Sequence, residues 1–159
     1  MNAEEAVAAV SKELAPWAKE TKLETPRRLY VRIDASDVVA ASRAMFERLG
    51  ARFATATGVD GRDAIEVLYH WCLDGAGIVA TIRTEAPKPD VTLDSITGVL
   101  PAALWIEREM HELLGVEFRG HPKLEPLLLA DDWPAGVYPL RRDFDPSQAS
   151  RPDDRSASQ

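Results

Sequence analysis

The sequence predicts an α+β fold, a small and mostly antiparallel sheet with helices packed on it, followed by a long extended C-terminal arm. Residues 52–57, 64–73 and 78–84 have the pattern of strands, and Asp-Gly turns at 60–61 and 74–75 join them into an antiparallel meander. An apolar stripe with helical spacing follows the meander. Beyond that stripe, Gly and Pro recur too often for regular structure.

The elements before the meander are read from periodicity and from helix end signals. Residues 3–19 predict an Ala-rich helix whose last turns are complicated by Pro16. Residues 29–33 alternate as a short strand, and a helix capped by Ser36 or Asp37 then runs to Gly50. The order helix, strand, helix, three strands, helix is typical of helices on one face of a sheet. At 159 residues, the chain is expected to form one core.

The last predicted helix has an apolar stripe and a charged flank. The stripe consists of Ala103, Ile106, Met110, Leu113 and Leu114, and Gly115 ends the helix. The flank consists of Trp105, Arg108, Glu109 and Glu112. Within it, Arg108 and Glu112 are four residues apart and can pair across one turn. The flank is either a solvated helix face or a surface that a partner buries, and spacing alone leaves both alternatives open.

The arm that follows combines chain breakers with large apolar side chains. The breakers are Gly120, Pro122, Pro126, Pro134, Gly136 and Pro139. The apolar residues are Phe118, Leu124, Leu127, Leu128, Leu129, Trp133, Val137, Tyr138 and Leu140, too many for a freely mobile linker. Either the arm folds over its own domain or it docks on another protein, and Trp133 and Tyr138 favour docking because such residues often anchor interfaces.

Charge and composition exclude several classes of protein. A net charge of −7 argues against a general nucleic-acid-binding surface. No apolar run approaches the roughly 20 residues that span a bilayer, and the N-terminus lacks the pattern of a signal peptide, so a cytoplasmic location is expected. The single Cys72 excludes an internal disulfide and is expected to be a buried thiol. Residues 145–159, rich in Ser, Asp, Arg and Pro, are expected to be disordered.

Motifs for chemistry are largely missing. His111-Glu112 begins like a zinc-protease motif, but Gly115 occupies the position of the second histidine. The three histidines, His70, His111 and His121, fall in a strand, a helix and the arm, so neither a metal nor another cofactor is expected on this chain. Two hypotheses remain, an interaction subunit or a small stand-alone enzyme using Glu109, Glu112 and His121. The first should be poorly ordered without its partner, and the second a well-behaved monomer or symmetric oligomer.

The charged helix and the arm resemble a known family, the 30-kDa subunit of respiratory complex I, which includes the equivalent subunit of energy-converting membrane-bound nickel–iron hydrogenases and formate hydrogenlyase. The family pattern is Glu-Arg-Glu, two residues, an acidic residue, two apolar residues, six residues, a His, and an Arg four further along. This chain has Glu107, Arg108, Glu109, Glu112, Leu113, Leu114 and His121. Glu125 stands where the pattern has Arg, so one expected contact differs. Segments 120–122, 131–133 and 139–143 also resemble the family.

The resemblance implies a non-catalytic scaffold subunit on the cytoplasmic side of a membrane, docked on a large catalytic subunit and on iron–sulfur subunits. Iron–sulfur clusters and a nickel–iron centre or flavin are then expected on partner chains. Residues 111–115, the Trp-Pro at 133–134 and residues 137–139 resemble the hydrogenase branch more than the NADH:quinone oxidoreductase branch. The expected division is an α+β domain over 1–115, a docking arm over 116–144 and the tail. The expected partner-binding residues are Trp105, Glu107, Arg108, Glu109, Glu112, Phe118, His121, Trp133, Tyr138, Arg141 and Arg142.

Overall fold

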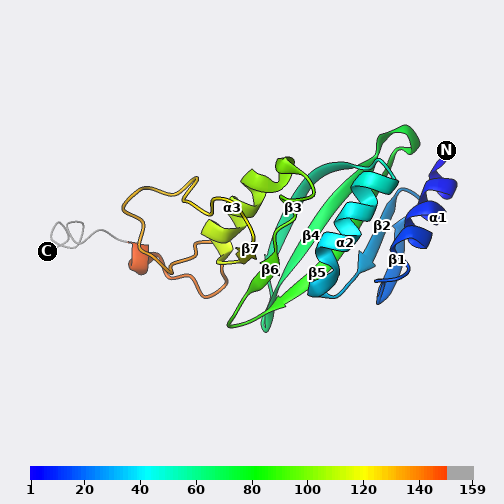
Figure 1. Ribbon diagram of the computed structural model, residues 1–159. Helices are drawn as coiled ribbons and strands as arrows, with labels where there is room; N and C mark the ends of the chain where they lie inside the picture. Colours follow the sequence, from blue (N-terminus) through cyan, green and yellow to red (C-terminus); the bar gives the residue numbers. More distant parts are fainter. Residues whose placement is uncertain (150–159) are drawn as a thin grey trace, which may run out of the picture.

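A computed structural model describes residues 1–149 and has a five-stranded mixed sheet with helices packed against it (Figure 1). The strand order is β1-β2-β5-β4-β3. The strands are β1 Glu20–Thr25, β2 Arg28–Arg32, β3 Arg52–Asp60, β4 Ala64–Leu73 and β5 Ile78–Pro87. The α+β class and the antiparallel meander of β3, β4 and β5 are confirmed. The sheet is mixed because β2 pairs with β5 in parallel.

The first strand of the sheet was not predicted. Helix α1, Ala3–Leu14, ends five residues before its predicted end, and β1 follows at Glu20. Every residue of β1 is exposed, so the segment lacks the alternation of apolar and polar residues by which strands are recognised. It is an edge strand held by antiparallel pairing with β2.

The second predicted helix is present but irregular. A 3₁₀ turn at Ala35–Asp37 leads into α2, Val38–Arg43, and a wider π-helical turn, Ala44–Arg48, completes it. The backbone N–H of Leu49 reaches the carbonyl of Ala44 at 3.2 Å, five residues back. Together with α1, this helix covers the apolar face of the sheet.

Strict alternation along β4 separates the core from an open sheet face. Ile65, Val67, Tyr69 and Trp71 are buried on the helix side. Cys72 lies on the opposite side, where it is only partly buried and free. The expectation of a buried thiol is therefore wrong, because an apolar strand sequence does not reveal which of its two faces is covered.

The predicted charged helix is α3, Leu104–Leu114, entered through a 3₁₀ turn at Pro101–Ala103. Two short strands, β6 Thr92–Asp94 and β7 Glu117–Arg119, pair in parallel on either side of it in the sequence. Val116 and Phe118 are buried, so the core continues past residue 115 into the predicted arm. No helix in the described part of the chain is long and apolar enough to cross a membrane.

Residues 120–145 contain no helix or strand, as expected for the arm, and they extend away from the sheet beside α3 (Figure 1). The start of the predicted tail forms a 3₁₀ turn at Pro146–Ala149. The remainder of that tail, residues 150–159, lies outside the described part of the chain.

Candidate partner-docking site

The first glutamate of the Glu-Arg-Glu motif anchors α3 from inside. The Glu107 side chain is 0% exposed, and its carboxylate accepts hydrogen bonds from the Ser95 hydroxyl at 2.6 Å and the Ile96 backbone N–H at 2.8 Å. Burial raises its pKa to about 7, although both hydrogen bonds oppose that rise. The expectation that Glu107 contacts a partner is corrected, because the chain itself encloses this residue.

Arg108 and Glu112 bind the arm and not each other. The Arg108 guanidinium donates to the carbonyls of Glu125 at 3.0 Å and Pro126 at 2.7 Å. The Glu112 carboxylate accepts from three successive backbone N–H groups, those of Leu127, Leu128 and Leu129, at 2.8 to 3.1 Å. The five hydrogen bonds form a clamp, and charge-assisted bonds of this kind are the stronger ones in proteins. Burial favours the neutral form of Glu112, but the three N–H groups outweigh it and lower the pKa.

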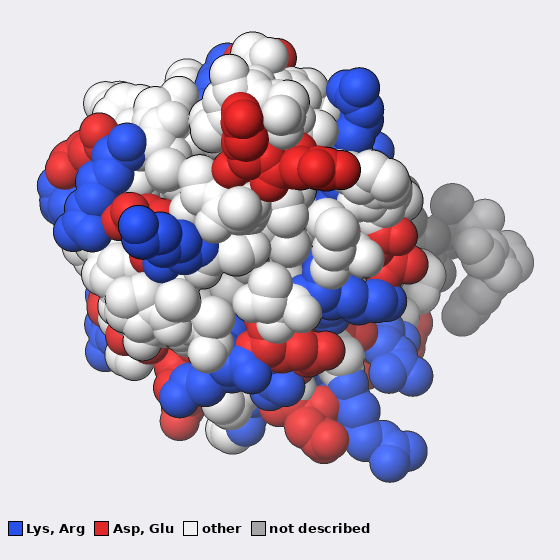
Figure 2. Space-filling model, turned by 90° about the vertical axis from the view of Figure 1, so that its right-hand side faces the viewer, with Lys and Arg blue, Asp and Glu red and all other residues white. Residues whose placement is uncertain are grey.

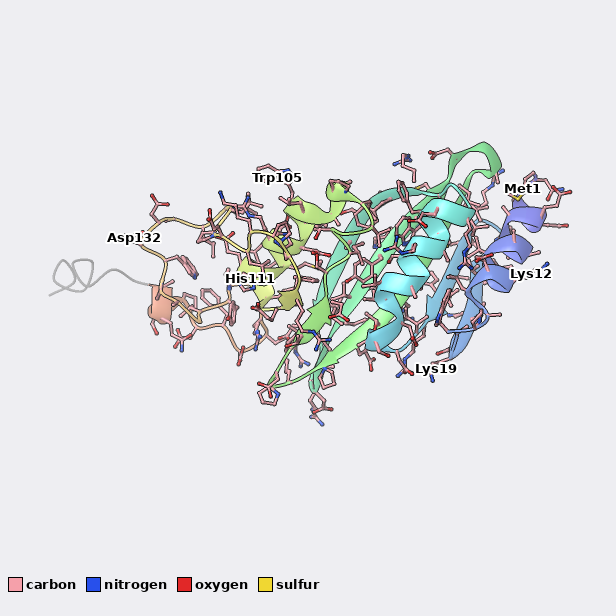
Figure 3. The ribbon with its side chains drawn as sticks, viewed as in Figure 1. Met1, Lys12, Lys19, Trp105, His111 and Asp132 are labelled. Atoms are coloured by element: carbon pink, nitrogen blue, oxygen red, sulfur yellow. The ribbon has the colours of Figure 1, made fainter. Side chains whose placement is uncertain are left out.

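Trp105 stands on the exposed side of the clamp. Trp105 is 61% exposed on the outside of α3 (Figure 3). The Arg108 guanidinium lies 5.2 Å from the centre of its ring. A cation over an indole ring can contribute about 0.5–1 kcal/mol at an exposed site. The pair therefore offers a large apolar surface whose position is fixed by the arm contacts of Arg108.

The far end of the arm returns to the end of α3. The Arg141 guanidinium donates to the Leu114 carbonyl at 2.7 Å and lies 4.7 Å from the Tyr138 ring centre. The backbone N–H of Arg142 donates to the Asp60 carboxylate at 2.8 Å, which ties the arm to the sheet. Of the two alternatives for the arm, the backbone follows the first: the arm folds over its own domain.

The remaining predicted residues of the arm are also held within the chain. Trp133 donates from its ring nitrogen to the Val137 carbonyl at 2.7 Å and stacks on Phe144. His121 bonds the Leu104 carbonyl at 3.0 Å and accepts from the Lys123 backbone N–H. Phe118 is 1% exposed, so its predicted role as a partner contact is corrected to a core residue. These contacts give the arm one defined path along α3.

Glu125 stands where the family pattern has Arg, and its contacts show the local effect of this difference. Its backbone carbonyl accepts from Arg108, a contact that any residue can make. Its side chain pairs with Lys123 at 3.2 Å, and both are more than half exposed. The change from Arg to Glu therefore leaves the clamp intact and alters only the outer charge.

The three side chains of the stand-alone enzyme hypothesis are not brought together. Glu112 lines a hollow enclosed by the arm, with His111 beside it, whereas Glu109 lines a separate groove next to β3. His121 lines neither. Glu112 and His121 are already engaged by backbone groups of the arm, so neither has a free position for acid–base chemistry on a substrate. Among the described residues, no three His, Cys, Asp or Glu side chains gather as a metal site.

The motif does not reveal two polar residues of this chain with which α3 and the arm form contacts. Ser95 and Asp60 hold α3 and the arm, but each is a single polar residue at or next to the end of a strand. The predicted turn at 60–61 located Asp60 without revealing its link to Arg142, 82 residues later in the chain. Three apolar side chains around the clamp remain largely exposed: Trp105, Leu128 at 61% and Leu140 at 59%.

Comparison with known proteins identifies the family. Residues 31–150 match the family described as respiratory-chain NADH dehydrogenase, 30 Kd subunit. The chain belongs to this family. Its match covers the sheet from the end of β2 onward, α3 and the arm, so the resemblance seen in the charged helix and arm is confirmed.

Curated relatives of this 30-kDa family member come from several kinds of oxidoreductase. It is 36% identical to a subunit of the F(420)H(2) dehydrogenase of Methanosarcina mazei over 99 residues, 60% of this chain and 62% of that protein. It is 34% identical to the beta subunit of the membrane-bound hydrogenase of Pyrococcus furiosus over 96 residues, 58% and 56% of the two chains. It is 38% identical to a subunit of the NADH-quinone oxidoreductase of Geobacter sulfurreducens over 63 residues, 40% and 38%. The matches span less than two thirds of each relative.

Two solved structures share the architecture. A chain of the membrane-bound sulfane sulfur reductase, an archaeal respiratory membrane complex, superposes with a TM-score of 0.78 at 32% identity, covering 89% of this chain and 85% of that one. The trypsin-resistant fragment of Nqo5 superposes with a TM-score of 0.58 at 21% identity, covering 78% of this chain and all of the fragment. At that identity, the second likeness supports the fold alone.

Proposed function

We propose that this chain is a non-catalytic scaffold subunit in the hydrophilic arm of a complex I-like membrane-bound oxidoreductase. It would dock the large catalytic subunit and iron–sulfur subunits on the cytoplasmic side of the membrane. Redox centres, iron–sulfur clusters with a nickel–iron centre or flavin, would belong to those partners. Membership of an oxidoreductase complex is supported by the relatives, which are named as subunits of such oxidoreductases.

The clamp between α3 and the arm is the single observation that carries the docking role. Arg108 and Glu112 hold 26 residues without helix or strand in one path, and Trp105, Leu128 and Leu140 stay exposed along it. Exposed large apolar side chains on a fixed support are typical of interface anchors. Fixing the arm beforehand lowers the entropy that docking would otherwise cost.

We favour the hydrogenase-type branch over an NADH:quinone oxidoreductase. The segments at 111–115, 133–134 and 137–139 support it, as does likeness to the beta subunit of the Pyrococcus furiosus membrane-bound hydrogenase. The Geobacter relative supports the alternative. The electron donor and acceptor and the ion translocated would be set by other chains.

Affinity purification of the tagged chain from its native membranes, with mass spectrometry of the co-eluting proteins, tests the proposal. A nickel–iron large subunit without NADH-oxidising subunits is the expected result. Flavin and NADH-binding subunits would assign the chain to the alternative branch. A chain that elutes alone from intact membranes would contradict the scaffold role.

Arg108→Glu is the variant that links assembly to the clamp. A carboxylate at this position would face the carbonyls of Glu125 and Pro126 and repel them, so we expect at least tenfold less co-purified large subunit from a chain that still folds. Arg62→Glu, the same charge reversal at an exposed hairpin residue, is the matched control and should co-purify normally. Equal recovery with both variants, or an unfolded Arg108→Glu chain, would count against a docking role for the clamp.

A further inference from the structure

The sheet ends in two edges of very different chemistry. The β1 edge carries Glu20, Lys22 and Glu24, and the molecule viewed from that end displays both signs of charge (Figure 2). The β3 edge reads Phe-Ala-Thr-Ala-Thr-Gly-Val over 53–59, without one charge. Charged side chains are a common means by which proteins prevent an edge strand from pairing with another chain. The β3 edge lacks this protection.

Backbone hydrogen-bonding groups on β3 are directed outward. The hairpin closes with a bond from the Gly61 N–H to the Ala64 carbonyl at 2.9 Å, and antiparallel pairs alternate from there. This alternation directs the N–H and C=O groups of Ala56 and Gly58 away from β4. The Ala56 carbonyl accepts one long bond, 3.3 Å, from the Thr55 hydroxyl. The other three groups have no hydrogen-bond partner among the described residues.

A groove of about 370 Å³ runs beside this edge. Its first wall is the β3 segment from Thr55 to Gly58. Its second wall is the flank of α3 formed by Ile106, Glu109 and Leu113, with Leu140 of the arm at the side. These helix positions are spaced by three and four residues, so they form one row. Alternate side chains of a strand added to β3 would point into the groove, because successive side chains of a strand point to opposite faces.

Among the described residues, Glu109 is the one charged side chain that lines this groove. Its neighbours Arg108 and Glu112 are occupied by the arm, whereas no hydrogen bond or ion pair of the Glu109 side chain occurs in the described part of the chain. A half-buried carboxylate between Ile106 and Leu113 favours a cation on whatever fills the groove. Two copies of this chain pairing through β3 would instead bring two such carboxylates into one interface.

We propose that an extended segment of a neighbouring subunit adds to the outer edge of β3 as a sixth strand, with apolar side chains in the groove and a lysine or arginine against Glu109. Backbone bonds to Ala56 and Gly58 would supply affinity, and the groove would supply specificity, as in other cases of strand addition. The inference rests on the proposed function only in requiring a neighbouring subunit.

Hydrogen exchange of the full chain, alone and in the affinity-purified assembly, tests the proposal. We expect the amides of Ala56 and Gly58 to exchange at least tenfold more slowly in the assembly. The amides of β1 should be unchanged. A photo-reactive residue in place of Thr57 should cross-link to a peptide of a neighbouring subunit that contains a lysine or arginine.

Charge variants at the groove complete the test. In the assembly, Glu109→Lys should abolish the protection of Ala56 and Gly58, and Glu109→Gln should reduce it. The control Glu4→Lys, at an exposed position of α1, should retain it. An intact assembly with unprotected β3, protection indifferent to Glu109→Lys, or a cross-link to a second copy of this chain would overturn the inference and leave the proposed function standing. Failure of the wild-type chain to co-purify with any subunit would overturn both.

Discussion

Three consecutive residues of α3 have three different environments. Glu107 points into the core, Arg108 binds the arm, and Glu109 faces the groove beside β3. An α-helix turns by about 100° per residue, so adjacent side chains cannot share a surface. The Glu-Arg-Glu motif is therefore three separate contacts, and substitutions at its three positions should have separable effects.

Replacing Glu107 by Gln should remove a pH dependence of stability. The folded-state pKa of about 7 exceeds the ordinary 4.5, so the folded state binds the proton more tightly than the unfolded state does. The stabilisation is fully present below pH 4.5 and is lost as pH rises through 7, a change of roughly 3 kcal/mol for such a shift. Urea unfolding of both proteins from about pH 4 to 9 should show the wild type losing stability relative to Glu107→Gln over that window. A constant difference between the two proteins would contradict the assignment.

Glu112→Gln should release the arm without unfolding the domain. An amide keeps one acceptor oxygen and turns an N–H₂ donor toward the N–H groups of residues 127–129, so at least one of the three bonds is lost. We expect those three amides to exchange about tenfold faster, because a lost hydrogen bond to a charged group costs about 1.5–3 kcal/mol. The identical change at Glu109, three residues earlier, should leave their exchange unaltered in the isolated chain.

At the scale of the element, the end of α3 is shaped by how closely the arm approaches it. Gly115 has a φ of +74°, and a side-chain carbon added there would lie 2.5 Å from the Tyr138 ring and 2.7 Å from the Arg141 guanidinium. A glycine is thus required for two reasons, the left-handed backbone that ends the helix and the space that the arm occupies. The end of α3 and the close packing of the arm both depend on this glycine.

Two alanine variants distinguish the contribution of the left-handed backbone from that of the space occupied by the arm. Gly120 also has a positive φ, +81°, but an added carbon would meet nothing within 4 Å. Gly120→Ala should cost only the left-handed conformation, about 1–2 kcal/mol. Gly115→Ala should cost more and should also increase hydrogen exchange at the amides of residues 138, 140 and 141. Equal losses of stability in thermal or urea unfolding, with an unchanged arm in both variants, would show that the close packing of Tyr138 contributes little.

At the scale of the whole molecule, Asp60 joins the sheet to the arm. Its side chain is nearly buried, pairs with Lys88 at 2.5 Å and accepts from the Arg142 backbone N–H. Burial opposes ionisation, but the Arg142 bond and the Lys88 ammonium lower the pKa. The carboxylate thus closes the arm back on the domain at the end opposite the clamp.

Asp60→Asn should release the far end of the arm from the sheet. The amide retains the shape but loses the charge that holds both Lys88 and the Arg142 backbone, so we expect tryptic cleavage after Arg141 and Arg142 to accelerate at least tenfold while the sheet remains folded by circular dichroism. Asp63→Asn, in the same hairpin and exposed, is the control and should be cleaved at the wild-type rate. Unchanged cleavage of Asp60→Asn would mean that the clamp alone holds the arm.

The amino-acid sequence is sufficient to predict the strands and helices in which apolar side chains recur with a clear period. The strand at 64–73 is found at its predicted bounds, and α3 ends at Gly115 as predicted, because one buried face imposes a strict pattern on each. The family motif and the arm without regular structure were also readable. The exposed β1 strand was missed, because no face of it is buried.

Contacts formed on folding determine which side chains face the protein and which face outward. The motif made Glu107, Arg108, Glu109 and Glu112 appear to be one charged surface, yet one is enclosed, two hold the arm and one is free in a groove. These roles depend on Ser95, on the backbone of residues 125–129 and on the edge of β3, which come close only after folding. Local periodicity fixes a helix and its faces, but what each face meets depends on contacts between residues far apart in the chain.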